Sequence, residues 1–253
     1  MSRVLTLTYG TVAYAIFFAT FCYAAGFVRN FLVPKSIDTG EPGPFPQSLA
    51  INAAVLALFA LQHSVMARPG FKRVWTRIVP KPIERSTFVL ASCAALITLF
   101  WQWRPMPAVV WDVDNAAGRV ALEALGWAGL GFVLFSTFMI HHFDLFGLRQ
   151  VWLHATGKGY TDLGFRTPGL YRYLRHPIML GFLIAFWATP VMTVGHLVFA
   201  LATTGYILIA VQFEERDLMR AFGKRYAAYK EQVPMLIPQV SRTAPAPLSP
   251  SRP

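Results

Sequence analysis

The sequence predicts an all-helical protein that crosses a membrane several times as a polytopic helix bundle. Of its 253 residues, 55% are hydrophobic and only 14% are charged, which is too apolar for a soluble domain of this size. The apolar residues gather in runs close to the length of about twenty residues that crosses a hydrocarbon layer of about 30 Å. The last two runs are separated by only a short turn, so they predict a transmembrane helical hairpin near the C-terminus.

Six apolar runs follow one another along the chain, at residues 5–28, 49–66, 86–101, 120–140, 178–192 and 194–213. The fifth run is short, which leaves the number of full spans at five or six. No small-residue cleavage pattern follows the first run, so we expect it to remain as a span. We predict a single domain over residues 1–240 and a disordered tail, rich in proline and serine, over residues 241–253.

The net charge of +11 is concentrated in three basic segments. They cover residues 68–85, 149–175 and 216–230, between the second and third runs, between the fourth and fifth, and after the sixth. The positive-inside rule places these segments in the cytoplasm, together with both termini. Basic side chains in such positions set topology and contact anionic membrane lipid. We therefore predict no nucleic-acid partner, and we predict no obligate protein partner.

The stretch over residues 171–231 has the clearest features of a binding site. A proline is well tolerated at the first position of a helix, so we expect a helix to begin at Pro177. Its unpaired N–H groups and positive dipole end, beside Arg175 and His176, would form an anion site. The returning helix of the hairpin would bring Glu214 and Glu215 to the same end. One positive and one negative pole, close together, would suit a zwitterion.

These residues also resemble a known module. The segment RHPIMLGF, an apolar hairpin and the segment EERDLMRAFGKRYAAYKEQVP are similar to the C-terminal cofactor module of integral-membrane methyltransferases. That group includes the isoprenylcysteine carboxyl methyltransferases and the phospholipid N-methyltransferases. The resemblance covers about residues 165–238 and implies S-adenosylmethionine as cofactor, bound at the cytoplasmic end of the hairpin. Met179 departs from the group, which usually has an aromatic residue there, and this leaves the contact to adenine open.

The resemblance also implies roles for individual residues. Glu214 and Glu215 would accept hydrogen bonds from the ammonium and ribose hydroxyls of the cofactor, or one of them would only pair with nearby basic side chains. Three residues at the start of the helix, Arg175, His176 and Pro177, would bind the carboxylate of the cofactor. Tyr171 would stack on or hydrogen-bond to the adenosine, and Gly181 would let the cofactor approach the backbone closely.

A narrower likeness extends over most of the chain. The segments QHSVMARPGFKR, KPIERS, HHFDLFGLRQVWL and FRTPGLYRYLRHP resemble the nurim family, and within it the bacterial methanethiol S-methyltransferases. This likeness implies an enzyme of a bacterial inner membrane that methylates a small thiol, methanethiol, to dimethyl sulfide. Two alternatives stay open: methylation of a lipid or a prenylated cysteine, and a non-catalytic membrane protein of the nurim type. The roles of His63 and of the basic segment 68–85 also stay open.

Methylation of a thiol requires a base, because a thiol with a pKa of about 8.5 or above is mostly protonated near neutrality. His141, His142 and Asp144 lie at the cytoplasmic end of the fourth run. We predict that His142 or His141 removes the proton and that Asp144 orients the imidazole. Alternatively, the three side chains only satisfy a helix end at the interface. The histidines lack HExxH or cysteine-rich spacing, so we predict no metal site.

Overall fold

The computed structural model describes residues 2–237, so the predicted disordered tail at 241–253 lies outside the described residues. The described chain is built mainly of helices and divides into two compact units. The first unit contains residues 2–114, 143–160 and 190–202. The second unit contains residues 115–142, 161–189 and 203–237.

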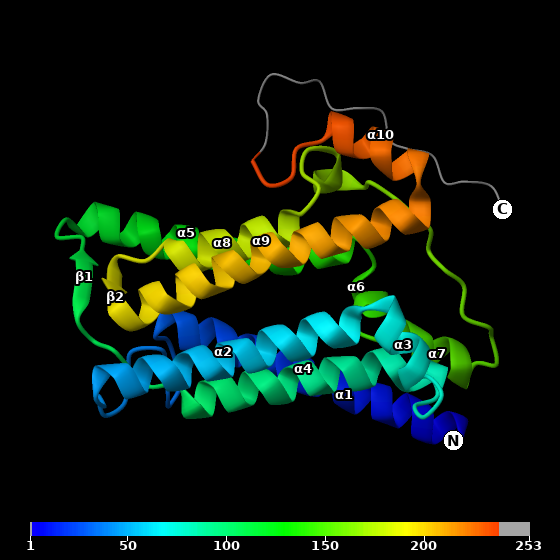
Figure 1. The fold of residues 1–253 in the computed structure, drawn as a ribbon, viewed down its shortest axis with the longest axis horizontal. Helices are drawn as coiled ribbons and strands as arrows, with labels where there is room; N and C mark the ends of the chain where they lie inside the picture. The colour runs from blue at the N-terminus through cyan, green and yellow to red at the C-terminus, as the bar shows by residue number, and fades with distance from the viewer. Residues whose placement is uncertain (1, 238–253) are drawn as a thin grey trace. The chain divides into compact units, whose positions relative to one another are not determined.

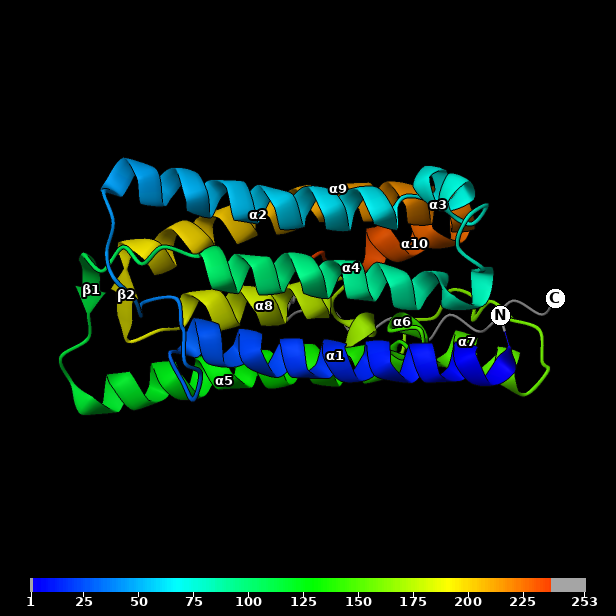
Figure 2. The same ribbon diagram turned by 90° about the horizontal axis from the view of Figure 1, so that it is seen from below.

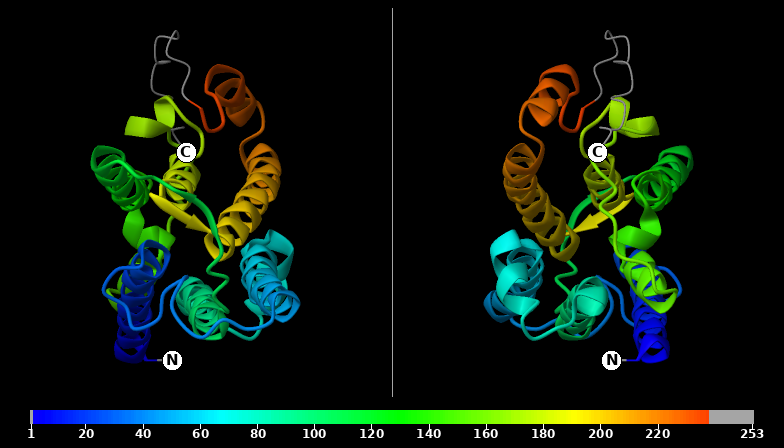
Figure 3. Two further views of the ribbon diagram at one scale, coloured as in Figure 1. Left: turned by 90° about the vertical axis from the view of Figure 1, so that its left-hand side faces the viewer. Right: turned by 90° about the vertical axis from the view of Figure 1, so that its right-hand side faces the viewer.

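The first unit is organised around one central helix. Its helices are α1 (Arg3–Arg29), α2 (Phe45–Ala67), α3 (Pro69–Trp75), α4 (Lys81–Gln102) and α7 (Leu148–Ala155). Helix α4 packs against both α1 and α2, and the end-on views in Figure 3 show it between them. Helix α7 packs against α1 and α4. A buried cluster of Phe88, Val89 and Cys93 lies on α4, with Phe17 of α1 packed against it.

Short polar and proline signals set the ends of these helices. The Ser2 hydroxyl accepts a hydrogen bond from the Leu5 N–H at the start of α1. Asn30 ends α1 in a left-handed conformation with φ 52°, which asparagine tolerates better than most residues. Helices α2, α3 and α4 each have a proline in the first turn, where a missing N–H leaves no intrahelical bond unmade.

A small sheet closes the first unit at one end. Strand β1 (Val109–Asp112) pairs antiparallel with strand β2 (Val191–Thr193), as Figure 2 shows. The Thr193 hydroxyl accepts a hydrogen bond from the His196 N–H and so caps the start of α9 (Val194–Phe222). The same hydroxyl donates to the Asp38 carboxylate at 2.5 Å. This contact ties the loop after α1 to the start of α9.

In the second unit, helices α5 (Ala116–Met139) and α8 (Pro177–Trp187) pack closely against each other, side by side in Figure 1. A Cβ atom on Gly181 would lie 2.9 Å from the Gly129 carbonyl oxygen, and one on Gly129 would lie 2.8 Å from the Gly181 carbonyl oxygen. Glycine at both positions therefore lets the two backbones touch. The Trp187 indole N–H donates to the Thr204 hydroxyl at 2.9 Å and links α8 to α9.

The second unit ends in an aromatic cluster. It contains the 3-10 helix η1 (Gly169–Arg172) and helix α10 (Lys224–Gln232). Tyr226, Tyr229 and Val233 are buried together, with Phe165 and Phe222 packed against them. The short helix α6 (His142–Leu145) contributes its first residue to the second unit and the rest to the first.

Within residues 2–237, five helices are long and apolar enough to cross a membrane: α1, α2, α4, α5 and α9. This confirms the predicted polytopic helical architecture. Helix α8 has 11 residues, which at 1.5 Å per residue is about half of the roughly 30 Å of a hydrocarbon layer. The predicted helical run up to residue 192 is therefore wrong at its end: α8 stops at Trp187, Pro190 cannot continue it, and β2 follows.

Candidate functional site

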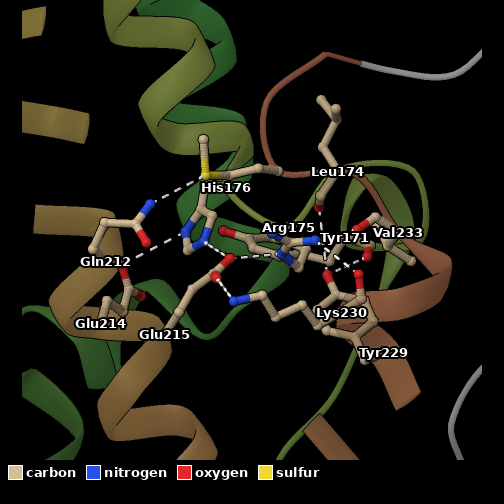
Figure 4. Close-up of polar contacts among 11 residues, drawn as sticks. Tyr171, Leu174, Arg175, His176, Gln212, Glu214, Glu215, Tyr229, Lys230 and Val233 are labelled. Atoms are coloured by element: carbon tan, nitrogen blue, oxygen red, sulfur yellow. Dashed lines mark hydrogen bonds and ion pairs between the residues drawn. The ribbon is translucent and has the colours of Figure 1, made fainter. Parts of the chain in front are cut away.

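Two sequence motifs almost forty residues apart meet in the second unit. Arg175 and His176 immediately precede α8, and Glu214 and Glu215 lie near the end of α9. Figure 4 shows their side chains pointing toward one another. The Glu215 carboxylate lies 2.7 Å from the Arg175 guanidinium and 3.2 Å from the His176 imidazole. The expectation that the hairpin brings the two motifs together is confirmed.

Glu215 is the centre of this cluster. Its Oε1 accepts from Arg175 Nε and contacts His176 Nε2, while its Oε2 lies 2.7 Å from Lys230 Nζ on α10. The side chain is only 4% exposed. Both carboxylate oxygens are therefore engaged by basic side chains of the protein, so the two expected poles contact each other instead of standing apart.

Glu214 has a different environment from its neighbour. Its side chain is 48% exposed, and its Oε2 lies 3.6 Å from His176 Nδ1. The imidazole of His176 thus lies between the two carboxylates, with one nitrogen facing each. Since His176 is buried and Glu214 is half exposed, Glu214 offers the accessible carboxylate of the pair.

Arg175 also fastens the C-terminal helix to the start of α8. Its Nη1 donates to the backbone oxygens of Lys230 at 3.0 Å and Val233 at 2.5 Å. The backbone N–H groups of Arg175 and His176 donate to the carbonyl oxygens of Pro234 and Met235. With a side chain only 8% exposed, Arg175 is a cross-link between three parts of the second unit.

The start of α8 and the η1 segment complete the cluster. Pro177 is the first residue of α8, so the next N–H groups of that turn have no intrahelical acceptor. Tyr171 in η1 is buried, and its carbonyl oxygen accepts from the Tyr229 hydroxyl at 2.6 Å. Burial and then the Glu214 carboxylate raise the pKa of the Tyr171 phenol, which therefore stays protonated. Gly181, one turn into α8, packs against α5.

The two histidines after α5 have different partners, both in the second unit. His142 is 2% exposed, and its Nδ1 lies 2.8 Å from the Thr137 hydroxyl. Its ring stacks on Phe138 with a centroid distance of 4.1 Å and an interplanar angle of 1°. Burial lowers the pKa of His142. His141 has a positive φ of 72°, and its Nε2 lies 3.1 Å from Nη1 of Arg166.

Asp144 is held within the first unit. Its Oδ1 lies 3.0 Å from Nη1 of Arg149, and its Oδ2 accepts from the Tyr160 hydroxyl at 3.3 Å. The Arg149 guanidinium also lies over the Tyr160 ring, 5.2 Å from its centroid. The carboxylate of Asp144 is thus engaged by an arginine and a tyrosine, two partners that no sequence motif predicts.

Two further residues of these contacts, Lys230 and Thr137, could not be identified from sequence motifs. Lys230 lies 15 residues after Glu215, on a separate helix, and no local motif relates the two. Thr137 precedes His142 by five residues, a spacing that does not bring side chains together on a straight helix. The end of α5 at Met139 makes their contact possible. Among residues 2–237, no group of three or more His, Cys, Asp or Glu side chains is arranged to hold a metal ion.

Known proteins resemble this chain over most of its length. A methanethiol S-methyltransferase of Mycobacterium tuberculosis is 58% identical over 94% of this chain and 98% of its own length. A methanethiol S-methyltransferase of Crocosphaera subtropica is 51% identical over 96% of this chain and 95% of its own length. Mouse nurim is 29% identical over 68% of each chain. No solved structure matches the chain.

A protein-family comparison covers the same region as these likenesses. The family described as NnrU protein matches residues 52–235, which include the histidines after α5 and the whole Glu215 cluster. The matched region is more than half of the chain and contains α4, α5 and α9 in full, together with most of α2. Together with the full-length likeness to the bacterial relatives, this match shows that the chain belongs to the NnrU family.

Proposed function

We propose that this protein transfers the methyl group of S-adenosylmethionine to a small thiol, methanethiol, and forms dimethyl sulfide. The observation that carries the proposal is the identity of 51–58% with relatives named methanethiol S-methyltransferase, over 94–96% of the chain. Such identity spans the apolar helices as well as the C-terminal cluster. The arrangement of charges around α8 and α9 supports the same conclusion.

The residues around the start of α8 fit the amino-acid part of the cofactor. The half-exposed Glu214 carboxylate would pair with its ammonium group. The N–H groups of the first turn of α8, at the positive end of the helix dipole, would bind its carboxylate. His176 and Tyr171 flank this position, and Tyr171 would donate a hydrogen bond to the adenosine.

Arg175 and Glu215 serve the same site in a different way. Because each engages the other, we assign them to holding α8, α9 and α10 in register around the cofactor. Glu215 is thus the carboxylate that pairs with nearby basic side chains, and Glu214 is the one that faces the cofactor. The predicted cofactor role of Gly181 stays a prediction, since the packing of α8 on α5 already requires glycine there.

His142 is the residue we assign as the base. When bound, the cofactor would supply a methyl carbon on a positively charged sulfur, and the electron pair of that bond would stay on the departing sulfur. The His142 imidazole would accept the proton of the thiol, which leaves the thiolate sulfur free to bond to the methyl carbon. An anion and a cation thus become neutral, so a site with little water favours the reaction.

The membrane supports this choice of substrate. Methanethiol and its thioether product are small and apolar, so both can partition through lipid to buried groups such as His142. The polar cofactor would enter from the cytoplasm, where the basic segments also place both termini. We place the protein in a bacterial inner membrane as a single domain over residues 1–240, in contact with membrane lipid. We assign Asp144 to positioning the loop that follows the base, through Arg149 and Tyr160.

Purified protein tests the proposed function directly. It would be incubated with S-adenosylmethionine carrying a labelled methyl group and with a panel of thiols, phospholipids and a prenylated cysteine. We expect labelled dimethyl sulfide in the headspace with methanethiol and no label in the lipid fraction. Label in a lipid or in the prenylated cysteine, without volatile thioether, would refute the thiol assignment. A Glu214→Gln variant serves as the matched control, because it should lose labelling at low cofactor concentration.

A further inference from the structure

We infer that Thr137 is a positioning residue that holds His142 in one tautomer, with hydrogen on Nδ1, so that Nε2 is the atom that accepts the thiol proton. Two hydrogen bonds at the end of α5 carry this inference. It rests on the proposed function, because it concerns the residue assigned there as the base. Beyond that function, it names the ring nitrogen that accepts the proton and the neighbouring residue that sets the tautomer.

The Thr137 hydroxyl has one hydrogen, and the structure gives that hydrogen an acceptor. Thr137 Oγ1 donates to the backbone oxygen of Leu134 at 2.6 Å. Its oxygen therefore acts as an acceptor in the 2.8 Å contact with His142 Nδ1. Nδ1 must then carry a hydrogen, and in a neutral imidazole the lone pair lies on Nε2.

Hydrogen-bond direction also distinguishes His142 from His141. A guanidinium can only donate, so His141 Nε2 accepts from Nη1 of Arg166 at 3.1 Å. The lone pair of His141 at that nitrogen is therefore already engaged in a hydrogen bond. His142 Nδ1 contacts a neutral hydroxyl instead of a guanidinium. The geometry thus favours His142 over His141 as the base.

The end of α5 also fixes the orientation of the ring. Thr137 contacts one edge of the imidazole, and Phe138 covers one face in parallel stacking at 4.1 Å. Two neighbouring residues on one helical turn therefore restrain both the rotation and the tautomer of His142. Burial of the ring lowers its pKa, so the imidazole is neutral and able to accept a proton near neutral pH.

The proton transfer is complete without another reactant. The S–H bond of the thiol breaks, its hydrogen joins Nε2, and the imidazole becomes an imidazolium with hydrogen on both nitrogens. The electron pair of the broken bond stays on sulfur and forms the new bond to the methyl carbon. The imidazolium then returns its proton to water, which restores the starting tautomer held by Thr137.

Nitrogen NMR of the cofactor-free protein in detergent micelles tests the tautomer without any measurement of activity. The protein carries six histidines, so His142→Gln is used to assign the His142 signals. We expect the wild type to show a protonated Nδ1 and an unprotonated Nε2 at pH 7.5. A wild-type His142 protonated on Nε2 at that pH would overturn the inference.

Variants at position 137 then connect the tautomer to turnover. Thr137→Val keeps the shape of the side chain and removes the hydroxyl, so we expect His142 to populate both tautomers. We also expect kcat to fall about tenfold, because the loss of one hydrogen bond of about 1.4 kcal/mol corresponds to a factor of ten in rate. KM for the cofactor should not change. Thr137→Ser should restore the tautomer and kcat, because serine can make both hydrogen bonds.

Ser136 supplies a matched control. Its hydroxyl donates to the Phe132 carbonyl oxygen at 2.7 Å, so Ser136→Ala removes a comparable helix bond from the neighbouring residue. We expect this variant to keep the tautomer and kcat of the wild type. A Thr137→Val enzyme with wild-type kcat, or equal losses in Ser136→Ala, would overturn the inference. Failure of the proposed function would look different, because the wild type would then methylate no thiol while its tautomer could still be read.

Discussion

Replacing Glu215 by glutamine is expected to lower the free energy of unfolding more than any other single change in the cluster. The carboxylate is 4% exposed and holds Arg175 and Lys230 at 2.7 Å each. Glutamine has nearly the same size, so it removes the negative charge and leaves the packing. Arg175, itself 8% exposed, would then keep a buried positive charge without its counter-ion.

The size of the effect follows from these contacts. Removing one partner of a buried ion pair costs about 3–5 kcal/mol. Arg175 keeps two backbone acceptors, and Lys230 is 44% exposed and can turn to water. We therefore expect the lower end, about 3 kcal/mol. For a chain of this size, 1 kcal/mol shifts the melting temperature by about 2–4 °C, so Glu215→Gln should lower Tm by roughly 6–12 °C.

Glu214→Gln is the control for charge, because it removes a carboxylate from the adjacent position. Its side chain is 48% exposed and lies 3.6 Å from His176, so we expect less than about 1 kcal/mol of destabilisation. Its affinity for S-adenosylmethionine should fall by roughly 10–100-fold, the loss of a charged hydrogen bond of about 1.5–3 kcal/mol.

Thermal unfolding in detergent and titration calorimetry with the cofactor separate the two effects. The reasoning would be refuted by a Glu215→Gln protein that melts like the wild type, or by equal Tm losses in the two variants. Wild-type cofactor affinity in Glu214→Gln would remove the assignment of its carboxylate to the ammonium group. Lys230→Met provides a further check, since its partly exposed ion pair should contribute less than that of Arg175.

Three other outcomes are expected. Gly181→Ala should lower stability by about 1–3 kcal/mol, because its Cβ would lie 2.9 Å from the Gly129 carbonyl oxygen; unchanged Tm in thermal unfolding would contradict this packing. His142 must be neutral to accept a proton, and burial lowers its pKa from 6.5. We therefore expect kcat/KM for the thiol to stay level above pH 6.5 and to fall as the pH drops below that value. A decline that begins above pH 6.5 would argue against His142 as the base. Asp144→Asn should lower turnover without changing the affinity for the cofactor. Arg149→Gln should have the same effect, because it breaks the same ion pair. Turnover rates and titration calorimetry on both variants test this prediction.

Much of the architecture could be read from local composition. A membrane span can be predicted from one apolar run alone, because the length of the run matches the thickness of the hydrocarbon layer. All five long apolar helices coincide with such runs. The short return after α8 could likewise be predicted from Thr189 and Pro190, and it brings the Arg175 and Glu215 motifs together. What local composition misjudged was the length of α8, because apolar residues continue into β2.

The sequence by itself thus determined the membrane class, the helical hairpin and the residues that meet beside it. Only the tertiary structure decided how those residues differ: Glu215 is buried among basic side chains, Glu214 remains accessible, and Lys230 joins from α10. It also selected Thr137 as the partner of His142. The physical reason is that apolarity and helix ends are properties of short segments, whereas burial and hydrogen-bond partners depend on segments distant in the chain and on where a helix stops.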